Sequence, residues 1–128
     1  MPPEFAAFCL SRYDVYLAYA TARVGDRERA RLLVQASLGD LAMVWPEALE
    51  SASPSALAWR LLAARTGCAV AGWRGGGPHR VLPAAQADAW LLRYRLGLTP
   101  QRAAEAMGRT PGEFETLLKK AVRTGAAA

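Results

Sequence analysis

The chain has 128 residues, of which 52% are hydrophobic and 21% are charged. This balance excludes a disordered chain and is sufficient for a packed core. No apolar run approaches the roughly 20 residues of a membrane span, so we expect no transmembrane helix. The net charge is +5. Residues 1–72 contain seven arginines and seven acidic residues, so the whole excess lies in residues 73–128. That asymmetry favours a polyanionic partner for the C-terminal part.

The composition predicts an all-α protein, because alanine and leucine dominate and β-branched residues are few. Apolar residues recur at helical spacing over 4–24, 27–45 and 55–71. Pro46 is expected to end or bend the second of these helices. Ser53 is the expected N-cap of the third. These three helices are expected to share a core made of Tyr16, Val34, Leu38, Trp45, Leu57 and Leu61.

Two cysteines and one histidine are present, at no spacing that suits a metal. We expect Cys9 and Cys68 to be buried free thiols in a reducing cytoplasm, with Cys68 on the inward stripe of the third helix. The first residues carry an acidic Glu4 and no basic stretch, so a secretory signal is not expected. The expected location is therefore cytoplasmic.

A glycine-rich segment at 73–80 is the predicted linker between a domain at 1–72 and a domain at 81–128. It lacks the Lys-Ser/Thr of a phosphate-binding loop and joins no strand to a helix, so we interpret it as a hinge. His79 is expected to be a solvated loop residue. The role of Trp73 stays open, between packing and stacking.

Three more helices are predicted in the C-terminal part, over 83–96, from Pro100 to Met107, and from Pro111 to about 123. The spacing of Thr110 and Glu113 predicts a capping box at the start of the last helix. The final residues, 125–128, are expected to fray.

The spacing around Gly108 is typical of a helix-turn-helix. Such a motif needs a small residue where its helices cross, a glycine in the turn and apolar anchors on the second helix. Residues of these types occur at the right spacing, namely Ala104, Gly108, Phe114 and Leu117. An ordinary pair of packed helices with a glycine turn is the alternative.

In a helix-turn-helix, the start and outer face of the second helix enter the major groove of DNA. The candidate DNA-binding residues are Arg102, Arg109, Thr110, Glu115, Thr116, Lys119, Lys120 and Arg123. Glu113 is expected to cap its helix, whereas Glu115 either accepts from a cytosine amino group or is solvated. Because no Arg or Asn occupies the reading face, an isolated module should bind with weak sequence specificity.

Residues 81–125 resemble region 4 of sigma-70-family RNA polymerase sigma factors, especially the extracytoplasmic-function group. The resemblance is carried by Leu82-Pro83, Leu92-Arg93-Tyr94, Gly97-Leu98-Thr99, Ala104, Gly108 and Phe114. More faintly, residues 25–45 are similar to the helix of region 2 that binds the polymerase core, and residues 55–65 are similar to the segment that follows that helix. The resemblance implies an all-α fold with an N-terminal three-helix region 2-like part and a C-terminal three-helix region 4-like helix-turn-helix. It also implies promoter DNA as a partner, with RNA polymerase core or a regulator protein as the protein partner.

Two departures from the family leave a second function open. Leu32 and Ala36 stand where the family has acidic residues that dock on polymerase, and Glu113 and Glu115 stand where it usually has polar or basic residues. The alternative is a sigma-like protein–protein interaction module that regulates transcription without binding DNA.

We expect no enzyme activity, no cofactor and no metal, because carboxylates are dispersed and no catalytic constellation is present.

Overall fold

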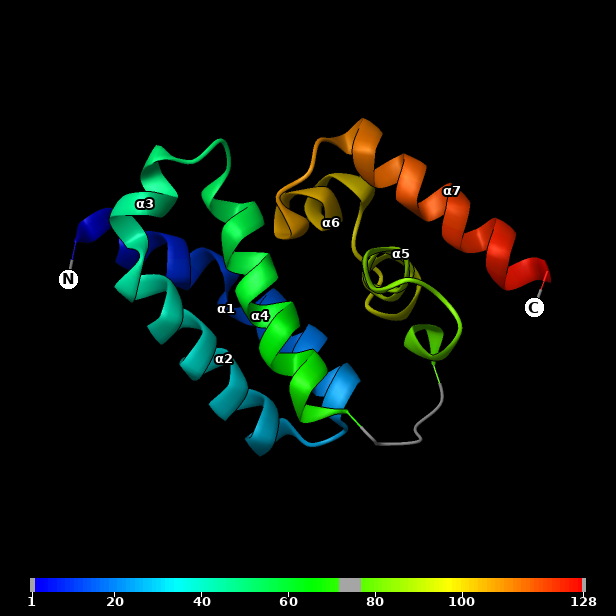
Figure 1. The fold of residues 1–128 in the computed structure, drawn as a ribbon, viewed down its shortest axis with the longest axis horizontal. Coiled ribbons are helices and arrows are strands. Elements are labelled where there is room, and N and C mark those ends of the chain that lie inside the picture. Colours follow the sequence, from blue (N-terminus) through cyan, green and yellow to red (C-terminus); the bar gives the residue numbers. More distant parts are fainter. Residues whose placement is uncertain (1, 72–76, 128) are drawn as a thin grey trace. The chain divides into compact units, whose positions relative to one another are not determined.

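The computed structural model describes residues 2–71 and 77–127. Within these ranges every regular element is helical, so the predicted all-α class is confirmed. The chain divides into two compact units, Met1–Ala71 and Gly72–Ala128. Each unit is described separately below, and Figure 1 shows the helices of both.

The first unit consists of three long helices and one short one. They are α1 (Pro3–Val24), α2 (Arg27–Met43), α3 (Trp45–Glu50) and α4 (Pro54–Ala69). Side-chain caps form at the start of α2 and, as predicted for Ser53, at the start of α4. The Asp26 side chain accepts from the backbone N–H of Glu28, and the Ser53 hydroxyl accepts from that of Ala56. Helix α1 packs on α2, and α4 packs on both. The unit is therefore a helical bundle whose short connections are closed by side-chain caps.

Aromatic side chains dominate the core of this bundle. The ring of Tyr19, which is fully buried, lies 4.5 Å from that of Trp59, and the ring of Tyr16 lies 6.0 Å from it. At the other end, Phe5 and Phe8 pack against Trp45 with centroid distances of 5.1 and 5.6 Å. These clusters hold α1 against α4 and α3, because large rings bury the most apolar area per residue.

The helix break expected at Pro46 is confirmed: α2 ends at Met43, and the proline lies in the first turn of α3, where its missing N–H costs nothing. The predicted inward faces of α2 and α4 are wrong in part. The buried face of α4 contains Trp59 and Leu62. Leu57 and Leu61, like Leu38 of α2, are only half-buried, and Cys68 is exposed. The bulky Trp59 ring sets the rotation of α4 and turns the cysteine outward.

The second unit contains two short irregular helices and three α-helices. They are η1, a 3₁₀ helix (Pro78–Arg80), α5 (Ala84–Trp90), η2, a π-helix (Leu91–Arg95), α6 (Pro100–Met107) and α7 (Pro111–Ala127). Helix α7 packs on α5 and α6 around a core that includes Leu82, Ala87 and Ala121. Helix α7 continues to Ala127, beyond the predicted end near 123.

The last turn of the predicted helix 83–96 is a π-turn. The backbone N–H of Leu96 donates to the carbonyl of Leu91 at 3.0 Å, an i→i+5 bond. Leu91 and Leu92 are both buried there. The widened turn therefore directs two consecutive leucines into the core, which an ideal α-helix face does less readily.

His79 is not the solvated loop residue that the sequence predicted. It belongs to η1, which packs on α5, and its side chain is only 17% exposed. Its Nε2 lies 2.5 Å from Oδ1 of Asp88, whose side chain is 4% exposed. A buried carboxylate requires such a partner, because an unpaired charge in the core is costly. Trp73, whose role was open, lies outside the described residues.

Among the helices that the structure describes, none combines the length and the apolar character needed to cross a bilayer.

Candidate nucleic-acid interface

Helices α6 and α7 are joined by a tight turn at Gly108. Gly108 has φ 70°, a left-handed conformation that favours glycine. The backbone N–H of Arg109 donates to the carbonyl of Ala104 at 2.9 Å, which closes the end of α6. At its other end α6 is capped by Thr99, whose hydroxyl accepts from the N–H of Arg102. Both ends of this eight-residue helix are thus fixed by local hydrogen bonds.

Helices α6 and α7 pack against each other, and two of the residues proposed to hold them together are buried. Ala104 is 1% exposed and Phe114 is fully buried. Met107 is also buried on α6, and Ala121 is buried on α7. Leu117, however, is only half-buried, so it contributes less to the contact than its spacing suggested. The small Ala104 side chain allows α7 to approach α6 closely, which a larger residue would prevent.

The capping box at the start of α7 is confirmed. The carboxylate of Glu113 accepts from the backbone N–H of Thr110 at 2.8 Å, and the Thr110 hydroxyl accepts from the N–H of Glu113 at 3.1 Å. The hydrogen bond from the Thr110 N–H lowers the pKa of Glu113 below its usual value. Both side chains are therefore engaged with the helix terminus.

All eight candidate DNA-binding residues are exposed: Arg102, Arg109, Thr110, Glu115, Thr116, Lys119, Lys120 and Arg123. On α7, Thr116, Lys119 and Arg123 follow at steps of three and four and so share the face opposite buried Phe114. Lys120 and Glu115 lie at the two margins of this face. The Thr116 hydroxyl already donates to the carbonyl of Gly112 at 3.0 Å, so its hydrogen atom is not free for a ligand.

The charge of this face is mainly positive and is not neutralised. Within the described residues, none of the five basic candidates forms an ion pair with a carboxylate. Helix α7 also contains two acidic residues, Glu113 and Glu115. The Glu113 carboxylate accepts the hydrogen bond of the capping box. Glu115 is therefore the acidic group on α7 that remains outside the cap.

A shallow groove that sequence reasoning missed lies beside the basic face. It has a volume of about 490 Å³ and is lined by Tyr94, Glu115, Leu118, Lys119, Val122 and Arg123. The Tyr94 side chain is 53% exposed, and its ring lies 5.7 Å from that of Trp90. The walls of the groove come from η2 and α7, which are far apart in the sequence, so no local pattern predicted it.

In the parts of the chain that the structure covers, no cluster of three or more potential metal-ligating side chains occurs. Comparison of the chain with protein-family models, with curated proteins and with solved structures gave no match. The interface is therefore interpreted from its own geometry and charge.

Proposed function

We propose that this chain is a sigma factor-like transcription protein that binds double-stranded promoter DNA through α6 and α7. The observation that carries the proposal is the outer face of α7. There, exposed Lys119 and Arg123 have no carboxylate partner among the described residues, while Phe114 is buried on the opposite face. A helix with one buried face and one basic face is suited to the major groove of a duplex.

Phosphate contacts supply most of the binding energy in this proposal. Lysine and arginine side chains displace condensed counterions from the duplex, so affinity follows the number of basic groups engaged. Lys119, Lys120 and Arg123 lie on α7, Arg109 lies in the turn before it, and Arg102 lies on α6. We therefore expect three or four of these side chains to contact phosphates at one time.

Base reading is expected to be weak. Thr110 and Glu113, at the end of α7 that would enter the groove, bond to each other's backbone. The Thr116 hydroxyl donates to its own helix. Glu115 takes part in none of these bonds, and its carboxylate can accept from a cytosine amino group. Selection of a promoter would then depend on a protein partner, for which RNA polymerase core or a regulator is proposed.

The test is a fluorescence anisotropy titration of the full chain with a labelled duplex at several salt concentrations. With three or four phosphates engaged, log affinity should fall against log salt with a slope of about −3 to −4. Lys119→Ala should reduce the magnitude of the slope by about one. Arg60→Ala, which removes an exposed arginine from α4 of the charge-neutral half, is the matched control and should leave the slope unchanged. Binding with no salt dependence would contradict the proposal.

A second candidate function is a protein–protein interaction module that regulates transcription without binding DNA. It is favoured by exposed apolar side chains in the first unit, where Leu10 is 82% exposed and Met43 is 83% exposed. Large exposed apolar groups of this kind often mark partner surfaces. Under this candidate, the double variant Leu10→Ser/Met43→Ser would abolish partner binding in a reconstituted transcription assay, and Lys119→Ala would not.

A further inference from the structure

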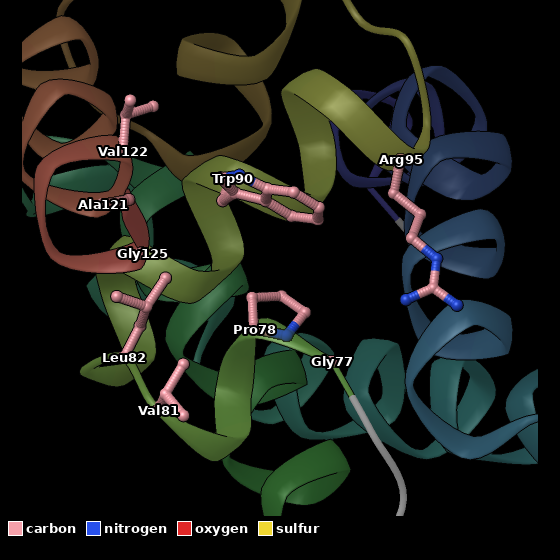
Figure 2. Close-up of a pocket in the computed structure, with 9 residues that line it drawn as sticks. All are labelled: Gly77, Pro78, Val81, Leu82, Trp90, Arg95, Ala121, Val122 and Gly125. Atoms are coloured by element: carbon pink, nitrogen blue, oxygen red, sulfur yellow. The ribbon is translucent and has the colours of Figure 1, made fainter. Parts of the chain in front are cut away.

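The second unit contains an apolar pocket that the proposed DNA contacts do not use. It has a volume of about 490 Å³ and lies among η1, α5, the end of η2 and the last turns of α7. Its walls include Pro78, Val81, Trp90, Val122 and Gly125. Figure 2 shows the indole of Trp90 between Pro78 on one side and Val122 on the other. A volume of this size falls within the range of about 300–1,000 Å³ typical of small-molecule sites.

One charged side chain stands at this pocket. This side chain is Arg95, the last residue of η2. The other described residues that line the pocket are uncharged. The Arg95 guanidinium lies on the Gly77 side of the pocket (Figure 2), where a Cβ atom added to Gly77 would be 3.8 Å from Nη1. In the described part of the chain, the guanidinium makes no hydrogen bond and no ion pair. The pocket thus combines apolar walls with a guanidinium group that no described residue binds.

We propose that this pocket binds a linear aliphatic carboxylate of about eight to ten carbons. The alkyl chain would lie against the Trp90 indole and the Pro78 ring, and the carboxylate would accept hydrogen bonds from Arg95. Burial of methylene groups against the apolar walls is energetically favourable. The guanidinium matches the planar, bidentate geometry of a carboxylate. A cationic amphiphile would have its charge repelled at the same position.

Chain length provides the first test, by calorimetric titration of the full chain with hexanoate, octanoate and decanoate. Each buried methylene group contributes about 0.8 kcal/mol, which is roughly a fourfold gain in affinity. Octanoate should therefore bind about 15-fold more tightly than hexanoate. Decylammonium should bind more weakly than decanoate. Affinity that does not depend on chain length, or that is equal for the two head groups, would overturn the proposal.

Two variants test the walls and the charge separately. Gly125 lines the pocket from α7, and a Cβ there meets no atom within 4 Å, so Gly125→Leu adds a bulky side chain at the pocket wall without a clash of its Cβ. Leucine also favours a helix over glycine, so loss of binding would not reflect unfolding. Gly125→Leu should abolish decanoate binding. Arg95→Gln should weaken it about fivefold, as expected for an exposed ion pair, and remove the preference for carboxylate over ammonium.

Matched controls keep the result specific to this pocket. Gly39→Leu makes the same change at a helical glycine of the first unit with open space around it, and Arg80→Gln removes an exposed arginine that does not line the pocket. Both should bind decanoate as the wild type does. So should Lys119→Ala, because the pocket is independent of the proposed DNA face. Wild-type affinity in Gly125→Leu would overturn the proposal, as would a pocket that takes up an apolar peptide but no carboxylate.

Discussion

At the scale of single residues, the hydrogen bond between His79 and Asp88 ties η1 to α5. Asp88 lies on the buried side of α5, and His79 reaches it from η1. A buried carboxyl group is costly to fold without hydrogen-bond partners. The contact therefore holds η1, which forms the end of the predicted linker 73–80, against α5.

We expect His79→Ala to lower the free energy of unfolding by about 1–3 kcal/mol, because it leaves a buried acceptor without one of its partners. Arg80→Ala, at the exposed neighbouring position, should change it by less than about 0.5 kcal/mol. Urea unfolding followed by circular dichroism measures both values. Equal values for the two variants would contradict a stabilising role for the pair.

At the scale of elements, the crossing of α6 and α7 depends on the small size of one side chain. Ala104 is buried on α6, which packs on α7, and the carbonyl of the same residue accepts from the N–H of Arg109 in the turn. A larger side chain there would force the two helices apart. The position of α7, and with it the basic face, follows from this contact.

Ala104→Leu should destabilise the protein by about 1–3 kcal/mol through overpacking. Gln101→Leu introduces the same side chain at an exposed position of α6 and is the control, with an expected change of less than about 0.5 kcal/mol. Thermal unfolding of both variants provides the comparison. A stable Ala104→Leu variant with an unchanged melting temperature would show that the helices do not cross closely at this residue.

The capping box makes a pH-dependent contribution to stability. The pKa of Glu113 is lowered in the folded state by the N–H of Thr110, so its contribution is complete above its ordinary value near 4.5 and is lost as the pH falls through the folded pKa. Glu113→Gln keeps a side-chain acceptor without the charge. The wild type should therefore be more stable than Glu113→Gln at pH 7, and the difference should shrink below about pH 4.5. Urea unfolding at pH 7 and pH 3 checks this, and a difference that grows on acidification would contradict it.

The elements were predictable where local chemistry determines them. Caps at Ser53, Thr99 and Thr110 and the turn at Gly108 follow from residue type and spacing, and the helices near them begin or end as expected. The predicted rotation of α4 was wrong in part, because alanine and leucine occur around its whole circumference, so more than one apolar stripe fits the helical spacing. The large Trp59 side chain, packed on two tyrosines, decides it.

The candidate site was predictable only in part. Exposure of the basic residues follows from their place on an amphipathic helix, as does burial of Phe114. The groove beside Tyr94 and the pocket beside Trp90 were not predictable, because each is formed by residues that are far apart in the sequence. The contact of His79 with Asp88 likewise depends on the packing of η1 on α5. No local sequence pattern predicts that packing.

At the scale of the whole molecule, charge distinguishes the two halves of the chain. The net +5 belongs to residues 73–128, and residues 1–72 are neutral. A neutral half with exposed Leu10 and Met43 is suited to a protein partner, and a basic half is suited to a polyanion. The two proposed partners, DNA and a transcription protein, thus fall on different parts of the chain.

Glu115→Lys should strengthen binding to duplexes of any sequence, because it removes a repulsion and adds a phosphate contact at the margin of the basic face. The salt slope should become steeper by about one. Anisotropy titrations with two unrelated duplexes measure this change, and Glu47→Lys, at an exposed position of α3, is the control with the same change in net charge. Equal effects of the two variants would show that net charge alone, and not the α7 face, governs affinity.

The central claim is that the outer face of α7 contacts DNA, and chemical-shift mapping of the ¹⁵N-labelled full chain with an unlabelled duplex tests it most directly. The account predicts that the largest perturbations at moderate salt fall on Thr116, Lys119, Arg123 and the turn at Arg109, and that residues of α2 and α4 shift little. Perturbations confined to residues 2–71, or none at all at near-millimolar protein and duplex, would contradict the account.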